Sequence, residues 1–300
     1  GGNAAVVRIH GKNKGIAITV DSSARYCLAD PISGAKQVVS ETWRNLIAAG
    51  SSPIAITNCL NFGNPEKENI MGQFVECIDG ISQACGYLDF PVVSGNVSFY
   101  NETNNKPIPP TPTIGGVGLI RNLDEMLTIN IKEIGSNIII VGKTLGHLYQ
   151  SEFFKEVMEI NNGPPPAVNL FNEKNNGLII QKLNSKKLIS SVHDLSSGGL
   201  IMCLTEMCIA GNIGAKIKLP KSSMSYHEYL FGEDQSRYLI EVNKKNMDEA
   251  IMILKKNAIY YEIIGETQKG SITIDKEFNV DLKELIELNS FWFKNYFKEN

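Results

Sequence analysis

The sequence predicts a chain of two domains, an α/β sheet domain followed by an α+β domain. Three observations support this fold class. The chain has 300 residues, enough for two domains that each bury a core. Short apolar strand patterns alternate with amphipathic helix patterns over residues 1–120, and a second set of strands and helices occupies residues 137–300. Residues 121–136 between them form a predicted polar linker.

The elements of the first domain follow from local patterns. Two strands joined by a polar turn come first and predict a hairpin. A helix begins after Asp30, because Asp caps helix N-termini and Pro31 suits the first helical position, and it ends at Gly50. A second helix carries apolar residues from Met71 to Cys85 on one face. The predicted strands cover residues 4–9, 15–21, 53–57, 91–93 and 113–120.

The second domain mixes helices and strands. Apolar runs of four to six residues predict its strands, and longer runs with helical spacing predict its helices. The predicted strands cover residues 137–141, 188–192, 238–242, 261–264 and 271–274. The predicted helices cover residues 149–160, 170–183, 199–210, 247–256 and 282–297.

Composition excludes several classes of protein. Hydrophobic residues make up 43% and charged residues 20% of the chain, and the net charge is -3 with a pI near 5.9. This balance argues against a general nucleic-acid binder or a membrane-surface protein, and no apolar run is long enough to span a bilayer. The six cysteines form no Cys-x-x-Cys pair, so we expect buried, reduced thiols and a cytoplasmic location. The opening Gly1-Gly2-Asn3, without Met, suggests a piece of a longer chain.

Two polar stretches follow buried strand patterns of the first domain and are candidates for a ligand site. One is the loop predicted at residues 58–65, and the other begins at residue 94. In the second, Gly95 lets a ligand approach the backbone, and Asn96 and Ser98 lie on the same side of an extended chain. An amide oxygen and a hydroxyl suit a site for Mg²⁺ and phosphate. The competing interpretation is a polar turn that only caps a strand.

A third stretch, His193-Asp-Leu-Ser-Ser-Gly-Gly-Leu200, follows a strand pattern of the second domain. Two interpretations of Asp194 stay open. It is a metal- or phosphate-site carboxylate beside a helix N-terminus, or else Asp194 or a following Ser caps that helix. His193 is predicted to be structural, because adjacent residues of a strand face opposite ways. Glu233 and Asp234 form a second acidic turn.

Six motifs occur together and in order: Asp30-Pro31, Thr57-Asn-Cys-Leu-Asn-Phe-Gly-Asn-Pro-Glu66, Gly95-Asn-Val-Ser-Phe-Tyr-Asn-Glu102, Pro110-Thr-Pro112, His193-Asp-Leu-Ser-Ser-Gly-Gly-Leu200 and Gly232-Glu-Asp-Gln-Ser-Arg237. Together they closely resemble phosphoribosylformylglycinamidine synthase (PurL, FGAM synthase), a purine-biosynthesis family of the AIR-synthase-like, or PurM-like, superfamily. The resemblance covers the whole chain but only the second half of the family's duplicated chain. It implies a PurM-like N-terminal-type domain whose sheet pairs into a barrel, and a PurM-like C-terminal-type domain.

The resemblance implies an ATP-dependent ligase. In this family ATP phosphorylates the amide oxygen of formylglycinamide ribonucleotide, and ammonia from a glutaminase attacks the iminophosphate, while Mg²⁺ offsets charge on the phosphoryl group. Carried over by position, Gly95 contacts ATP, Asn96 binds Mg²⁺ and Ser98 binds the ribonucleotide. Asn58 stands where the family usually has an ATP-contacting Asp. It accepts a hydrogen bond but carries no charge, which puts the strength of that contact in doubt.

The resemblance also implies partners. These are formylglycinamide ribonucleotide, a glutaminase subunit and the missing N-terminal half, whereas no nucleic acid or membrane is expected. The family's catalytic histidines lie in first-half motifs that this chain lacks, so we assign no catalytic residue and expect the chain to fold without turnover alone. A severed half is expected to pair with itself as a homodimer. The competing functions are a non-catalytic nucleotide-binding or assembly scaffold and a stand-alone homodimeric enzyme of the AIR synthase kind.

Overall fold

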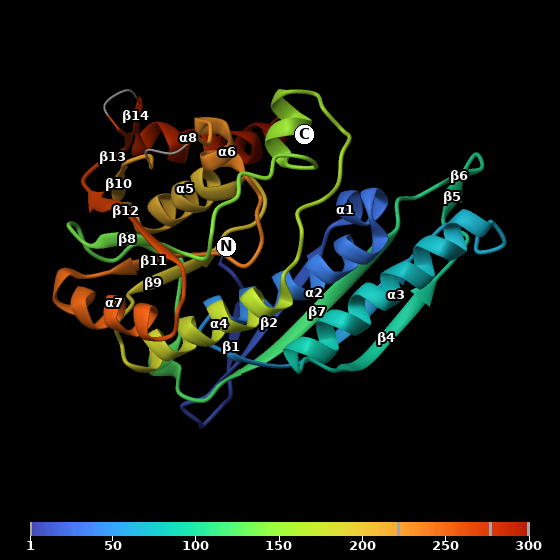
Figure 1. Ribbon diagram of the computed structural model, residues 1–300, viewed down its shortest axis with the longest axis horizontal. Helices are drawn as coiled ribbons and strands as arrows, with labels where there is room; N and C mark the ends of the chain where they lie inside the picture. Colours follow the sequence, from blue (N-terminus) through green and yellow to red (C-terminus); the bar gives the residue numbers. More distant parts are fainter. Residues whose placement is uncertain (1, 221–222, 276–277, 299–300) are drawn as a thin grey trace.

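Two large sheets organise the chain (Figure 1). The computed structural model describes residues 2–220, 223–275 and 278–298. The strands of the first sheet are β1 (Ala5–Arg8), β2 (Gly15–Ser22), β3 (Ser52–Asn61), β4 (Val92–Ser98) and β7 (Thr111–Ile120). Their order is β1-β2-β7-β3-β4, and among these pairs β3 and β4 are parallel while the others are antiparallel. A small ribbon of β5 (Glu102–Thr103) and β6 (Lys106–Pro107) follows β4.

Three helices cover one face of the first sheet, α1 (Ala24–Ala29), α2 (Pro31–Ala48) and α3 (Glu68–Leu88). The predicted start of α2 is confirmed, because the Asp30 side chain accepts a hydrogen bond from the Ser33 backbone N–H at 2.9 Å. Val38 and Leu46 of α2 are fully buried. The short helix α1, with six residues, was not predicted because it is too short to show a helical period.

The second sheet has seven strands in the order β14-β13-β10-β12-β8-β11-β9. In chain order these strands are β8 (Asn137–Val141), β9 (Ser191–Asp194), β10 (Gly214–Ile217), β11 (Tyr238–Val242), β12 (Tyr261–Gln268), β13 (Ser271–Ile274) and β14 (Phe278–Asp281). The predicted strands at β8, β11 and β13 are confirmed to the residue. Ile138 to Val141 are all buried, because β8 lies between two other strands with apolar layers on both faces.

The helices of the second part lie on both faces of its sheet (Figure 1). They are α4 (Leu170–Ser185), α5 (Gly199–Gly211), α6 (Tyr226–Phe231), α7 (Met247–Lys256) and α8 (Leu282–Tyr296), with short helical turns η1 (Leu123–Glu125), η2 (Phe153–Val157) and η3 (Lys244–Asn246). In the described part of the chain, no helix is both long and apolar enough to cross a bilayer.

One apolar core joins the two sheets. Trp43 and Leu46 of α2 belong to the same buried cluster as Ile180 of α4 and Ile139 of β8. The contact between α2 and α4 is close, since a Cβ on Gly177 would lie 2.1 Å from the Trp43 ring. A second cluster fills the far side of the second sheet. The core of the first sheet is therefore continuous with one face of the second sheet.

Two local predictions are also wrong. The predicted polar loops at 58–61 and 94–98 are strand residues, because β3 and β4 continue through them and pair with each other. Backbone pairing inside a sheet outweighs the weak strand preference of Asn and Gly. The helix predicted at 149–160 is reduced to the π-helical turn η2. There the Glu152 backbone N–H donates to the Glu233 carboxylate instead of continuing a helix.

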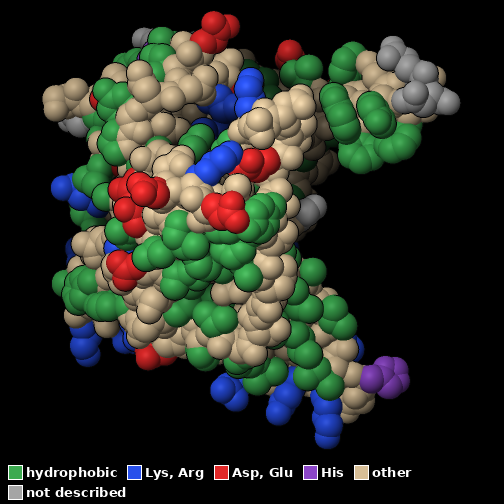
Figure 2. All heavy atoms as spheres, turned by 90° about the vertical axis from the view of Figure 1, so that its right-hand side faces the viewer, with side chains coloured by type: hydrophobic (Ala, Val, Ile, Leu, Met, Phe, Trp, Pro, Cys, Tyr) green, Lys and Arg blue, Asp and Glu red, His purple; other side chains and the backbone are tan. Residues whose placement is uncertain are grey.

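The face of the first sheet opposite the helices is uncovered in this chain. It exposes apolar side chains that alternate along β2 and β7, including Ile18 at 42%, Val20 at 67% and Val117 at 38% exposure. On the side of the molecule drawn in Figure 2, hydrophobic side chains gather at the upper right, above a concave part of the surface. The C-terminal part of α8 adds exposed aromatic residues, among them Trp292 and Phe293.

Candidate functional site

The four predicted site residues lie on two neighbouring strands. The parallel register pairs Asn58 of β3 with Gly95 of β4, Cys59 with Asn96, and Asn61 with Ser98. Successive side chains of a strand point to opposite faces. Ile56 and Leu60 are buried beneath the helices, so Asn58 between them points to the helix-covered face. The structure therefore brings all four residues together, but not on one face.

Asn58 reaches into a cavity on the helix side. Its amide oxygen lies directly over Gly95, where a Cβ would come within 1.9 Å of Oδ1. The cavity, of about 660 Å³, lies between α3 and the start of β4. Its walls combine apolar side chains with a hydroxyl, an amide and a carboxylate, from Ile78, Ile81, Ser82, Cys85, Asp89, Phe90, Val92 and Asn58. An apolar slot with a few polar groups suits a flat heterocycle such as a nucleobase.

Asn96 and Ser98 point to the uncovered face. Asn96 is exposed, and Ser98 is half-buried. The Asn101 side-chain amide donates to the Ser98 hydroxyl at 3.2 Å and to the Ser98 carbonyl at 3.0 Å, which fixes the end of β4. The expectation that Asn96 and Ser98 share one side is met by this geometry, since Val97 lies between them on the strand.

The position of β4 decides what a single ligand can touch. It is an edge strand with accessible residues on both faces. A ligand that contacts both Asn58 and Asn96 has to pass around this free edge. The Asn96 amide oxygen fits a Mg²⁺ ion as one neutral oxygen ligand. Among the described residues no group of three or more His, Cys, Asp or Glu is placed to hold a metal ion.

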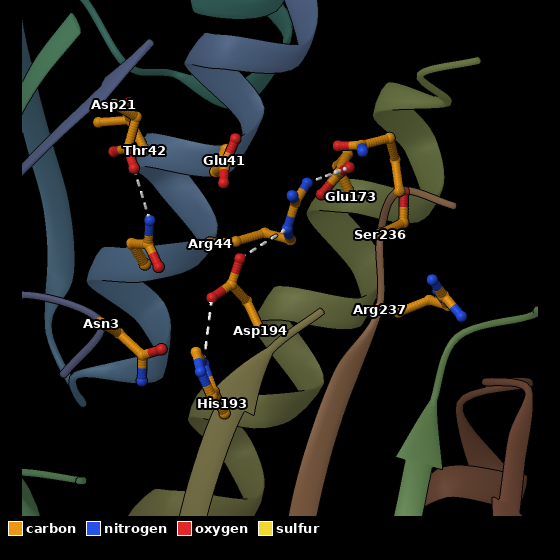
Figure 3. A network of polar contacts seen from close by, with 12 residues as sticks. Asn3, Asp21, Glu41, Thr42, Arg44, Glu173, His193, Asp194, Ser236 and Arg237 are labelled. Atoms are coloured by element: carbon orange, nitrogen blue, oxygen red, sulfur yellow. Dashed lines mark hydrogen bonds and ion pairs between the residues drawn. The ribbon is translucent and has the colours of Figure 1, made fainter. Parts of the chain in front are cut away.

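A buried charge cluster lies between the two sheets (Figure 3). Arg44 of α2 is fully buried, and its Nη1 donates to Glu173 Oε1 of α4 at 2.8 Å. Its Nε lies 3.6 Å from Asp194 Oδ2 of β9. Burial raises the pKa of Asp21 to about 6, and the nearby Asp194 carboxylate adds to the rise. Burial likewise raises the pKa of Glu41 to about 7.

Asp194 has neither of its two predicted roles. It is the last residue of β9, is 2% exposed and pairs with Arg44, and the N-cap of α5 is Gly198. His193 lies 3.4 Å from the same carboxylate and 2.8 Å from Glu206. Burial lowers the pKa of His193, but the neighbouring Asp194 and Glu206 carboxylates outweigh it and raise that pKa to about 9. The prediction of a structural histidine agrees with these contacts.

The carboxylates of the acidic turn, Glu233 and Asp234, accept hydrogen bonds from groups of this chain, mostly backbone N–H groups. One Glu233 oxygen accepts hydrogen bonds from the backbone N–H of Gly198 at 2.8 Å and of Glu152 at 2.7 Å, and the other accepts from the Tyr26 hydroxyl. Asp234 accepts from three consecutive backbone N–H groups, those of residues 145–147. Both carboxylates therefore fill the places that an external anion would take.

Sequence reasoning missed Arg44 and Glu173. A single Arg or Glu inside an amphipathic helix pattern is usually exposed, and nothing local marks these two as buried. Arg44 and Glu173 pair with each other, although they lie 129 residues apart in the chain. The sequence feature that could have indicated their burial is the pair of large apolar residues next to Arg44, Trp43 and Leu46. They pack this turn of α2 against the second sheet.

Comparison with known proteins identifies the family. Residues 1–120 match the AIR synthase related protein N-terminal domain, and residues 133–276 match the C-terminal domain of the same family. The chain belongs to the AIR synthase related family. Phosphoribosylformylglycinamidine synthase subunit PurL of Pelagibacter ubique is 52% identical over 296 residues, which are 99% of this chain and 40% of that protein. PurL of Azorhizobium caulinodans is 45% identical over 100% of this chain and 41% of its own length.

These matches confirm the resemblance stated from the motifs. The chain spans about 40% of the length of the curated relatives that it matches. Solved structures share the AIR synthase related fold. PurL of Thermotoga maritima complexed with ATP aligns with a TM-score of 0.78 at 18% identity over 94% of this chain and 46% of that chain. Thiamine-monophosphate kinase of Stenotrophomonas maltophilia aligns with a TM-score of 0.65 at 14% identity over 91% and 92%.

Proposed function

We propose that this AIR synthase related chain is the second half of a cytoplasmic ATP-dependent ligase of purine biosynthesis. The whole enzyme converts formylglycinamide ribonucleotide, ATP and glutamine-derived ammonia to formylglycinamidine ribonucleotide, ADP and phosphate. The observation that carries the proposal is 52% identity to PurL across 99% of the chain. In the proposed division, residues 1–120 are the N-terminal-type domain, 121–136 the linker and 137–300 the C-terminal-type domain.

The proposed nucleotide site uses both faces of β4. The base lies in the cavity beside Asn58, where the amide oxygen accepts a hydrogen bond from a base or ribose donor. Gly95 gives the ligand access to the backbone, and the phosphates pass around the strand edge toward Asn96. Ser98, two residues on, donates to the ribonucleotide. A Mg²⁺ ion bound at Asn96 would offset charge on the transferred phosphoryl group.

The chemistry requires activation of an amide. Its oxygen is a poor leaving group until ATP phosphorylates it, and phosphate then leaves as ammonia attacks the carbon. This chain supplies positioning groups, and the proposal assigns the proton-transferring histidines to the missing first half. The apolar uncovered face of the first sheet supports a partner sheet, which is that first half in the whole enzyme. In its absence a second copy covers the face, so light scattering should detect a homodimer.

Reconstitution tests the proposal. The first half of Pelagibacter ubique PurL, produced separately, is mixed with this chain, and ADP release is followed with formylglycinamide ribonucleotide, ATP, Mg²⁺ and ammonia. We expect no turnover by this chain alone and turnover by the pair. Binding of nucleotide without turnover by the pair would favour the scaffold, and turnover by this chain alone would favour a stand-alone enzyme.

Substitutions on β4 sharpen the test. Asn96→Ala and Ser98→Ala should each lower turnover of the pair at least about tenfold, because each removes a hydrogen-bonding or metal-binding oxygen from the site. The matched control is Ser94→Ala, which changes an exposed residue of the same strand and face and should keep turnover within about twofold. Equal losses of turnover in all three variants would show that turnover depends on the integrity of β4 and not on the side-chain oxygens of Asn96 and Ser98.

A further inference from the structure

A small polar cavity lies at one end of the second sheet, apart from the sheet that carries β3 and β4. Strands β8 and β11 are antiparallel, with Asn137 opposite Val242. The segment before β8 and the segment after β11 therefore lie side by side. The cavity between them has a volume of about 320 Å³ and is lined by Glu133, Ile134, Gly135, Ser136, Asn243, Lys244 and Lys245.

The charge at this cavity is positive. Lys244 and Lys245 are exposed, and in the described part of the chain neither ammonium group has a hydrogen-bond or ion-pair partner. A Cβ on Gly135 would lie 3.9 Å from Lys244 Nζ, so this ammonium stands close to the loop before β8. Glu133 brings one carboxylate to the same cavity. Two ammonium groups against one carboxylate favour an anion.

A buried hydroxyl at the cavity lacks a partner. Ser136 is 1% exposed, and its Oγ makes no hydrogen bond within the described residues. A buried polar atom without a partner costs free energy, so such atoms usually mark an unfilled place for water or ligand. A hydroxyl serves an anion as a donor. This observation is independent of the lysine charges and points to the same kind of ligand.

The loop that carries Ser136 is held rigidly from both sides. The buried Glu241 carboxylate accepts hydrogen bonds from the backbone N–H groups of Lys132 at 2.9 Å and Glu133 at 3.0 Å. The Thr267 hydroxyl donates to the Glu133 carbonyl at 2.6 Å and accepts from the Ser136 N–H at 2.9 Å. A loop fixed in this way loses little conformational entropy when a ligand binds.

We propose that this cavity binds a phosphate group, with Lys244 and Lys245 as its counter-charges and the Ser136 hydroxyl as a donor. The cavity has room for a phosphate with a body the size of a pentose. The group comes either from free phosphate or from a small sugar phosphate.

Titration followed by amide NMR tests the site on the whole chain. Inorganic phosphate and ribose 5-phosphate are added separately at low ionic strength. We expect saturable shifts at the amides of Gly135, Ser136 and Lys244 with at least one of them, weakening as salt is added. Shifts with inorganic phosphate alone assign the site to free phosphate, and tighter binding of ribose 5-phosphate assigns it to a phosphorylated metabolite.

Two variants and a control decide the role of the side chains. Lys244→Ala with Lys245→Ala should weaken binding at least about tenfold, because both charge-assisted contacts are lost. Ser136→Ala should weaken it a few-fold without lowering the melting temperature, since that hydroxyl has no partner to lose. The control is Lys255→Ala with Lys256→Ala, the same charge change at the other end of α7. No saturable shift with either ligand, or equal affinity in both double variants, would overturn the proposal.

Discussion

At the scale of single residues, Gly95 shows how close packing between β3 and β4 restricts which residue can stand at the proposed ligand site. The amide of Asn58 occupies the space that any side chain at position 95 would need. Glycine is therefore required there for packing, and not only for backbone freedom. The sequence pointed to both residues, but it could not show that one covers the other, because that contact depends on the register of two strands.

We predict that Gly95→Ala weakens ATP binding by the reconstituted pair about three- to tenfold. The added Cβ would lie 1.9 Å from Asn58 Oδ1, so the amide has to turn away and lose its hydrogen bond to the ligand. Calorimetric titration measures the change. As a control, Gly72→Ala on α3, where a Cβ meets nothing within 4 Å, should keep the affinity and stabilise the fold by about 0.5–1 kcal/mol. Unchanged affinity in Gly95→Ala would remove Asn58 from the nucleotide site.

Arg44 is the residue on which the joint between the sheets depends. We predict that Arg44→Ala lowers the free energy of unfolding by about 3–5 kcal/mol, because it leaves Glu173 and Asp194 buried without a counter-charge. Urea denaturation measures the loss. Arg25→Ala provides the comparison, since its ion pair with Glu152 is 25% and 40% exposed and should contribute less than about 1 kcal/mol. Similar losses in the two variants would contradict this account.

At the scale of elements, α2, β2 and β9 share one cluster of carboxyl groups. The cluster holds more carboxyl groups than Arg44 can balance, and this excess helps to keep the pKa of Asp21 and Glu41 high. Such groups are neutral more readily in the folded chain than in the unfolded chain. The folded chain is therefore favoured by these two groups while both are protonated at low pH. This stabilisation is lost as the pH rises through about 6 to 7, because they then have to ionise inside the fold.

We predict that Asp21→Asn gains stability relative to the wild type by about 2–3 kcal/mol between pH 4 and pH 7. Asparagine stays neutral at every pH, whereas Asp21 has to ionise inside the fold as the pH passes its value of about 6. The amide oxygen can still accept the hydrogen bond that Asn45 donates to Asp21 at 2.8 Å. Urea denaturation at a series of pH values measures the difference, and parallel curves for the two proteins would refute it.

The elements also show what the sequence could predict. Strands β8 and β11 and helix α7 were predicted to the residue, because apolar runs and helical spacing there agree with the final packing. The helix predicted at 149–160 failed because Glu233, distant in sequence, accepts a hydrogen bond from the backbone N–H of Glu152. Asp234 fixes the segment just before it, at residues 145–147. The ends of β3 and β4 failed because pairing between strands, which no single stretch reveals, decides them.

At the scale of the whole molecule, the shared core predicts cooperative unfolding. Cluster members from α2, α4 and β8 are buried against one another, so neither sheet can lose its packing alone. We predict one thermal transition, with coincident curves from far-ultraviolet and near-ultraviolet circular dichroism. Two separated transitions would instead show that the two parts fold independently, in spite of their common core.

The distances along the chain between paired residues have a consequence for synthesis on the ribosome. The acceptor of Tyr26 is Glu233, 207 residues later in the chain, and the partner of Arg44 is Glu173, 129 residues after Arg44. When residues 1–120 have emerged and residues 121–300 have not, Arg44 of α2 has no carboxylate of α4 or β9 to pair with, and the apolar side of that helix has no second sheet to pack on. We therefore expect residues 1–120 to expose apolar surface until the rest is translated, which is the kind of surface that chaperones bind.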